Sequence, residues 1–244
     1  MPTFSLLPQL LREPAARWWR RFEEAPALAA ALDELSAETL DELLRVVAAS
    51  EFAATTLIRD PTALSWLVEF DTPPRIAEWA ASYERRVAAA PSTASAQQLL
   101  REWRRRAMLR IVWRDVTGRA TVRETLGSLS ELADGCLRAA SAAAQFHLSA
   151  TFGTPRNAAG DEATFIVVAM GKLGGRELNF SSDIDLIFLY SEGGETDNRS
   201  TDNSEFFNRL GREVIRLLDA PTEDGFVFRV DMRLRPLATV VRWW

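Results

Sequence analysis

Residues 166–190 read IVVAMGKLGGRELNFSSDIDLIFLY, and their pattern indicates both the fold class and the chemistry of the chain. Two aspartates, Asp183 and Asp185, stand two residues apart at the start of the run 186–190. A β-strand points residues i and i+2 to the same face, so the sequence predicts two carboxylates side by side. The run 186–190 is apolar on both faces, which is typical of a covered strand in the middle of a sheet.

Two adjacent carboxylates at a buried strand need a counter-charge, because burying unpaired anions is costly. A divalent cation supplies it, and oxygen-only ligands suit Mg²⁺ or Mn²⁺, which commonly link carboxylates to substrate phosphates. An Asp-x-Asp pair alone also occurs in exposed turns, in metal-dependent glycosyltransferases and in phosphatases with an aspartate nucleophile. The glycine pair before it and the strand after it favour a metal site over an exposed turn.

The segments after this stretch supply further parts of a phosphate-handling site. The glycines at 174–175 allow backbone amides to approach a phosphate closely. Residues 204–218 have the spacing of a helix, with Ser204 as its expected cap. Residues 226–232 alternate like a strand, which would place Asp231 beside the first two carboxylates if the strands are neighbours. Two metals held by three carboxylates would stabilise the attacking and leaving oxygens of a phosphoryl or nucleotidyl transfer.

Three cationic residues flank these carboxylates. Lys172, the only lysine of the chain, lies next to the glycines, where a phosphate contact and a packing role in the turn are both open. Arg233 and Arg235 follow Asp231, and arginine forks suit phosphate oxygens. Their alternative role is an ion pair with Glu177 or with the metal carboxylates.

The composition fits a folded chain of one or two domains. The 244 residues carry a net charge of −5, and 47% are hydrophobic. The acidic balance gives no global basic surface for nucleic acid, and no apolar run has the length of a membrane span. One cysteine, Cys136, excludes an internal disulfide and favours a cytoplasmic setting. Cys136 and the single histidine, His147, are expected to be structural.

The chain is expected to divide at 152–162, where glycine and proline cluster. Residues 1–152 show helical periodicity, including a helix capped by Ser36. The arginine-rich segment 101–114 is expected to be a solvated helix face with ion pairs to nearby glutamates. Residues 153–244 carry the strands and the carboxylates. The sequence therefore predicts an α+β chain, with a helical region at 1–152 and a mixed sheet within 153–244.

The stretch 170–190, with Phe228-Arg229-Val230-Asp231-Met232-Arg233-Leu234-Arg235-Pro236 behind it, resembles the glutamine synthetase adenylyltransferases. Segments 50–52, 109–115 and 129–134 are similar to the helical leader of that family. The loop form Asn179-Phe180-Ser181-Ser182 is similar to the N-terminal, adenylyl-removing copy of its two transferase domains. The resemblance implies a polymerase-beta-like nucleotidyltransferase fold that is incomplete at its C-terminus.

The resemblance also implies an activity, its ligands and its partners. Phosphate would attack the AMP phosphorus on an adenylylated tyrosine of glutamine synthetase, releasing ADP, whereas the second copy of the full-length family adds AMP from ATP. Besides glutamine synthetase, the nitrogen-signalling PII protein is an expected partner. The catalytic and metal-binding residues would be Asp183, Asp185 and Asp231. The phosphate-binding residues would be Gly174, Gly175, Ser182, Lys172, Arg233 and Arg235.

Two alternatives to this function stay open. One is another polymerase-beta-like nucleotidyltransferase, such as an enzyme that modifies antibiotics. The other is a truncated, inactive frameshift product that at most binds glutamine synthetase or PII. Similar proteins continue after the Arg-Leu-Arg-Pro element with a run like Gly-Asp-Ser-Gly-Pro, and permitted codons for 237–244 encode that run when read one nucleotide earlier. This alternative predicts an exposed apolar tail and aggregation.

Overall fold

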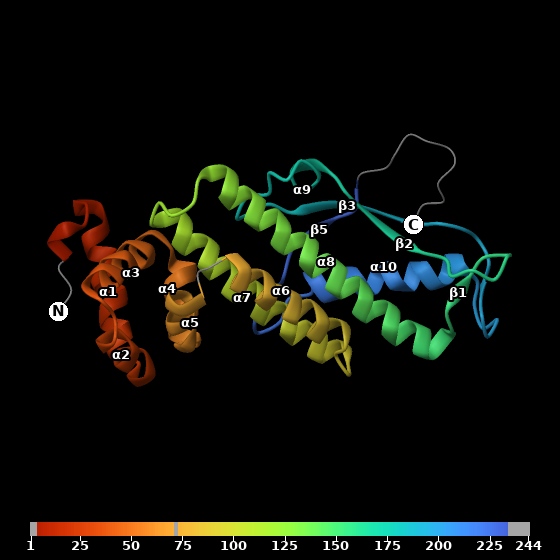
Figure 1. Cartoon of the computed structure of the whole chain (residues 1–244), viewed down its shortest axis with the longest axis horizontal. Coiled ribbons are helices and arrows are strands. Elements are labelled where there is room, and N and C mark those ends of the chain that lie inside the picture. The colour runs from red at the N-terminus through yellow and green to blue at the C-terminus, as the bar shows by residue number, and fades with distance from the viewer. Residues whose placement is uncertain (1–3, 71–72, 234–244) are drawn as a thin grey trace. The chain divides into compact units, whose positions relative to one another are not determined.

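The computed structural model describes residues 4–70 and 73–233 of the chain (Figure 1). The region before residue 152 is helical, and helices and short strands alternate after it, so the fold is α+β as expected. The helices are η1 (Phe4–Leu6), α1 (Gln9–Glu23), α2 (Pro26–Asp33), α3 (Ala37–Ala49), α4 (Glu51–Arg59), α5 (Thr62–Phe70), α6 (Pro73–Ala88), α7 (Thr93–Val116), α8 (Val122–Phe152), α9 (Gly171–Gly174) and α10 (Asn203–Asp219). The strands are β1 (Pro155–Arg156), β2 (Phe165–Ala169), β3 (Ile184–Tyr190), β4 (Glu195–Thr196) and β5 (Val230–Asp231).

The chain forms two compact units whose boundaries fall inside long helices. The first contains Met1–Glu78 and Arg105–Thr125, and the second contains Trp79–Arg104 and Leu126–Trp244. The expected boundary near residue 152 coincides with the end of α8, where the helical region gives way to strands. The second unit, which carries every candidate site residue that the structure describes, nevertheless includes helical segments from before that boundary.

Within the first unit, α3 shows how the sequence pattern determines a helix. Ser36 accepts a hydrogen bond at its Oγ from the amide of Thr39 at 3.1 Å, which confirms it as the N-cap. Leu43, Leu44 and Val47 are buried along one side of the helix, as the apolar spacing predicts. Leu44 packs with Ala15 of α1 in the core.

Within the second unit, a three-stranded sheet carries the candidate site. The strand order is β2-β3-β5, so β3 is central, as its apolar sequence predicts. The β2 strand pairs with β3 antiparallel, and β5 pairs with β3 parallel. One face of the sheet packs on α10, where the ring of Phe207 stacks with those of Phe165 and Tyr190. This arrangement sets the start of β3 beside β5 (Figure 1).

The helix expected at 204–218 is confirmed with a different cap. The α10 helix begins at Asn203, and Asp202 rather than Ser204 is the N-cap, accepting the Glu205 amide at 2.8 Å. The buried face contains the predicted apolar residues Phe206, Phe207, Leu210, Val214 and Leu217. An aspartate just before the first helical turn also complements the helix dipole, which explains the shift of the cap by two residues.

The strand expected at 226–232 is shorter than its alternating pattern suggests, because β5 contains only Val230 and Asp231. Val227 and Phe228 are both buried although they are neighbours in sequence. Their amides both donate to the carbonyl of Leu218, at 2.8 and 3.2 Å. This contact turns the chain against the end of α10, so regular strand geometry begins only afterwards.

Candidate functional site

Asp185 and Asp231 occupy opposed positions on the neighbouring parallel strands β3 and β5. The pairing is fixed by the hydrogen bond from the Ile184 amide to the Arg229 carbonyl, 2.9 Å long, and by the register of Ile184 with Val230. The prediction that the strand with the third carboxylate lies next to the strand with the pair is therefore confirmed. Asp183 lies immediately before Ile184, the first residue of β3.

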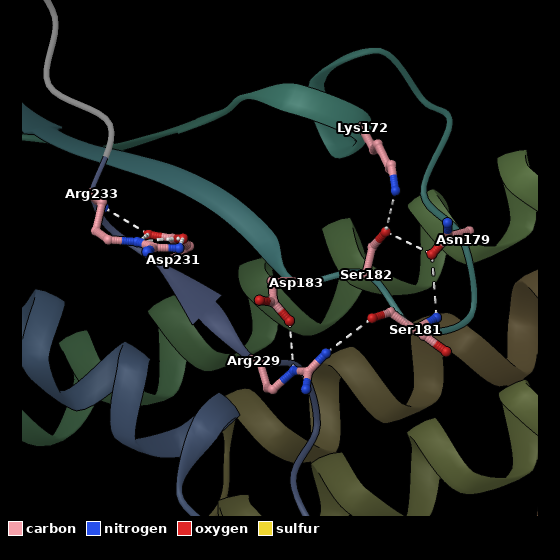
Figure 2. A network of polar contacts seen from close by, with 8 residues as sticks. All are labelled: Lys172, Asn179, Ser181, Ser182, Asp183, Arg229, Asp231 and Arg233. Carbon is pink, nitrogen blue, oxygen red and sulfur yellow. Dashed lines mark hydrogen bonds and ion pairs between the residues drawn. The ribbon is translucent and has the colours of Figure 1, made fainter.

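Asp183 forms an ion pair with Arg229, in which Nε lies 2.6 Å from Oδ1 (Figure 2). The same guanidinium donates from Nη2 to the carbonyl of Ser181 at 3.0 Å. Both partners remain about half exposed, with side-chain exposures of 46% for Asp183 and 55% for Arg229, so solvent screens the pair. The contact links the residue just before β5 to the loop before β3.

Asp231 is bound by Arg233, two residues further along the chain (Figure 2). The Nε atom lies 3.0 Å from Oδ1 and 2.9 Å from Oδ2, Nη2 also donates to Oδ2, and the Arg233 amide donates to Oδ1 at 2.9 Å. These hydrogen bonds lower the pKa of Asp231 to about 2. Asp231, followed by the charges of Asp183 and Asp185, raises the pKa of the Arg233 guanidinium. One cation thus lies in the field of all three carboxylates.

The loop between β2 and β3 begins with the short helix α9, and two of its glycines are required by close approaches. Gly171 has φ of +54°, and a Cβ there would lie 2.4 Å from Oδ2 of Asp185. A Cβ on Gly174 would lie 2.5 Å from the Ala169 carbonyl oxygen. Glycine at these positions therefore lets the backbone contact Asp185 and the end of β2 directly.

The amides of Gly174 and Gly175 already donate hydrogen bonds within the protein, whereas the expected phosphate binding assumed that these amides are free. They donate to the carbonyls of Met170 and Gly171, each at 3.0 Å, because residues 171–174 form a helical turn. The glycine pattern signals close packing of the turn here. A role of Gly174 and Gly175 toward phosphate stays a prediction.

Lys172 points to the loop 179–182 and donates from Nζ to Ser182 Oγ at 3.2 Å (Figure 2). Ser182 Oγ in turn donates to Asn179 Oδ1 at 2.6 Å, and the Ser181 amide donates to the same oxygen at 3.3 Å. The structure thus brings together Lys172 and Ser182, two residues of the expected phosphate set. Asn179 Oδ1 accepts both hydrogen bonds and thereby organises this turn.

An open pocket of about 820 Å³ lies beside β5 and is lined by Asp183, Asp219, Arg229, Val230, Asp231, Met232 and Arg233. Four of these residues were not predicted as site residues, and two of the four, Asp219 and Arg229, are charged. Arg229 could have been found, because the alternating pattern of 226–232 puts it on the same face as Asp231, two residues earlier. Asp219 gives no comparable signal, since it is the last residue of α10 and reaches the pocket only through the tertiary fold. Arg235 and the tail 237–244, to which the frameshift alternative refers, lie outside the described residues.

The donor set fits a hard divalent cation in its chemistry. Asp183, Asp185 and Asp231 offer only carboxylate oxygens, and together they already attract one guanidinium, that of Arg233. Over residues 4–70 and 73–233, no three acidic, histidine or cysteine side chains are yet gathered around one metal position. Arg229 and Arg233 hold two of the three carboxylates, so metal binding would require these ion pairs to rearrange.

Residues expected to be structural are buried or packed as predicted. Cys136 is fully buried, and burial raises the pKa of its thiol, so it is an unreactive core residue. His147 packs edge to face against the ring of Phe146. The helices of the described ranges contain no segment both long and apolar enough for a membrane span.

Comparison with known proteins identifies one family. The model of the family described as glutamate-ammonia ligase adenylyltransferase matches residues 40–240. Bifunctional glutamine synthetase adenylyltransferase/adenylyl-removing enzymes from Thioalkalivibrio sulfidiphilus and Pseudomonas aeruginosa are 46% and 44% identical to the chain, over 96% and 97% of its length. The one from Nitrosococcus oceani is 43% identical over 94% of the chain. The chain spans about a quarter of the length of these relatives, 24%, 25% and 24% respectively.

Proposed function

Because the chain belongs to the glutamate-ammonia ligase adenylyltransferase family, we propose that its site takes part in nucleotidyl transfer on glutamine synthetase. The relatives are named as enzymes that add and remove adenylyl groups on that protein. The observation that carries the proposal is the register of Asp185 with Asp231 on the paired strands β3 and β5. Asp183 lies immediately before β3 and lines the same pocket as Asp231. Two carboxylates on adjoining strands and a third just before one of them are suited to a reaction at a metal-bound phosphate.

Asp183, Asp185 and Asp231 would hold Mg²⁺ or Mn²⁺. When bound, the cation would supply a positive charge that neutralises phosphate oxygens and the departing tyrosinate. Arg233 would exchange Asp231 for a phosphate oxygen, since a guanidinium binds either anion through the same fork. Lys172 and Ser182, which are already hydrogen-bonded to each other, would place a second set of donors on the phosphate.

The proposed direction is the removal of AMP by phosphorolysis. Phosphate would attack the phosphorus of the adenylylated tyrosine, the P–O bond to the tyrosine would break, and ADP and unmodified glutamine synthetase would form. The loop form 179–182 supports this direction by its similarity to the adenylyl-removing copy. Adenylylation with ATP shares the same geometry at phosphorus, and PII as a regulatory partner is part of the same proposal.

The test is to incubate the chain with adenylylated glutamine synthetase, phosphate and Mn²⁺, and to measure ADP. Release of ADP that depends on phosphate and is lost in Asp185→Asn supports the proposal. Incorporation of AMP from ATP would reverse the direction. Absence of both, together with AMP transfer to an aminoglycoside, would favour another nucleotidyltransferase of the same fold.

A further inference from the structure

Arg101 of α7 is buried, with 2% of its surface exposed, although arginine is usually a surface residue. Its guanidinium donates from Nε to the Gly225 carbonyl at 2.8 Å and from Nη1 to the Leu217 carbonyl at 3.3 Å. Nη1 also donates to Gln97 of its own helix at 3.0 Å, and Nη2 donates to the Ala220 carbonyl. This corrects the expectation for segment 101–114 at Arg101, because its hydrogen-bond partners are backbone carbonyls and not glutamates.

Three of these four carbonyls belong to the end of α10 and the turn 220–225 that follows it. The last carbonyls of a helix lack partners within the helix, and a buried arginine satisfies them while complementing the negative end of the helix dipole. The turn itself is closed by two hydrogen bonds between the main chains of Thr222 and Gly225, at 3.1 and 2.9 Å. Arg101 therefore connects the start and the end of the turn through one rigid group.

The turn leads directly into the strand with the third carboxylate. After it, Val227 and Phe228 donate to the Leu218 carbonyl, and the Arg229 carbonyl accepts the Ile184 amide at 2.9 Å. Asp231 then pairs in register with Asp185. A shift of one residue in this register would move Asp231 to the other face of the sheet. The position of the turn thus decides which face Asp231 presents.

We propose that Arg101 is a positioning residue, whose guanidinium fixes the turn 220–225 and thereby holds Asp231 beside Asp185. Arg101 lines none of the pocket beside β5 and acts through the backbone. Arginine is required because its planar fork reaches carbonyls in several directions, whereas a lysine ammonium is a compact charge on a flexible stem. The consequence for metal binding rests on the proposed function, but the consequence for strand register does not.

Hydrogen exchange tests the register without any ligand. In Arg101→Lys and Arg101→Met, the amides of Val227, Phe228 and Ile184 should exchange about ten-fold faster or more, because buried carbonyls lose their donors and the turn opens locally. The amides of β2 should keep their wild-type rates. Thr93→Ala is the matched control, since it removes a different contact between α7 and α10, from Thr93 Oγ1 to Glu213 Oε1 at 3.0 Å. Should Arg101→Met unfold the chain, Arg101→Lys carries the test.

Mn²⁺ titration provides the second arm. Loss of a supporting residue typically weakens a metal site by about ten-fold, so Arg101→Lys should bind Mn²⁺ about ten-fold more weakly than wild type and Thr93→Ala. Wild-type exchange rates at Ile184, Val227 and Phe228 in Arg101→Lys would overturn the proposal, as would unchanged Mn²⁺ affinity in a chain that binds the metal. If the wild-type chain binds no Mn²⁺, the proposed function fails, and the exchange rates of these three amides decide the role of Arg101.

Discussion

Asp185 and Asp231 face each other across the parallel pair β3 and β5, although 46 positions of sequence, 185 to 231, separate them. Their juxtaposition depends on a parallel strand, which requires a long connection between β3 and β5, and α10 provides it. Neighbouring strands lie about 4.8 Å apart, so two carboxylates at paired positions repel each other unless a cation lies between or beside them. Arg233 fills this role in the structure.

The first prediction concerns the metal. Wild-type chain should gain thermal stability with Mn²⁺ or Mg²⁺, by about 2.7 kcal/mol at a concentration one hundred times the dissociation constant. Asp183→Asn combined with Asp185→Asn should abolish this gain, because two charged ligands are lost. Asp161→Asn, an exposed carboxyl outside the pocket, is the control. A metal-dependent shift that persists in the double variant would contradict the site assignment.

The second prediction concerns Arg233, whose guanidinium competes with a metal for Asp231. Arg233→Gln should raise Mn²⁺ affinity, because the guanidinium no longer competes with the metal for the Asp231 carboxylate. The same variant should weaken the binding of inorganic phosphate to the metal-loaded chain, because the fork is lost. Arg209→Gln, which breaks an exposed pair with Glu205 on α10, should change neither. Weaker binding of both ligands would show that Arg233 has no competing role.

The third prediction concerns Gly171. Gly171→Ala places a Cβ against Oδ2 of Asp185 and forces a non-glycine residue to keep φ of +54°. The left-handed conformation alone costs about 1–2 kcal/mol, so unfolding in urea should show at least this loss. Gly193→Ala is a suitable control, because nothing lies within 4 Å of its Cβ position. Equal stability of the two variants would contradict both the clash with Asp185 and the strain of the left-handed backbone at position 171.

The elements with strong local patterns could be predicted from the sequence. The α3 helix follows from its cap at Ser36 and its apolar stripe, and β3 from an apolar run bounded by aspartates. The α10 helix was predicted to within a residue at each end, but its cap was misplaced because both Asp202 and Ser204 have side chains that can accept an N-terminal amide. Such short-range signals suffice to predict these helices and this strand, and to select the three carboxylates as site residues.

What could not be predicted depends on tertiary contacts. The alternation of 226–232 suggests one long strand, yet the Leu218 carbonyl holds Val227 and Phe228 against α10. Three of the four carbonyl partners of Arg101 belong to residues more than one hundred positions away, so no local pattern reveals them. The expected phosphate role of Gly174 and Gly175 assumed free amides, and the turn of α9 uses those amides internally.

The fourth prediction concerns pH. Burial, followed by the hydrogen bond to Glu102, raises the pKa of Tyr83 to about 12 from the ordinary value of 10.0. A raised pKa in the folded state means that the protonated phenol stabilises the fold. This contribution is complete below pH 10 and is lost as the pH rises toward 12. Unfolding free energy should therefore fall over this interval in wild type, and less in Tyr83→Phe. An equal decline in both proteins would assign it to other groups.

The fifth prediction concerns how the loop 171–183 is attached to α8. The Leu178 amide donates to Ser130 Oγ at 3.2 Å in a buried position, while Arg176 pairs with Glu131 at 3.1 Å in an exposed one. Ser130→Ala leaves a buried amide without its acceptor, which costs about 1–3 kcal/mol. Arg176→Gln breaks exposed ion pairs, which are worth less than about 1 kcal/mol each.

The stability lost in each variant should therefore depend on how deeply the broken contact is buried, and not on whether it is charged. Urea unfolding should show a larger loss of stability for Ser130→Ala than for Arg176→Gln, and high salt should reduce only the smaller loss, since it screens exposed charges. Ser130→Thr, which retains the hydroxyl, should recover part of the stability lost in Ser130→Ala. The reverse ranking would mean that the ion pairs of Arg176 with Glu131 and Asp134, and not the buried amide, hold the loop on α8.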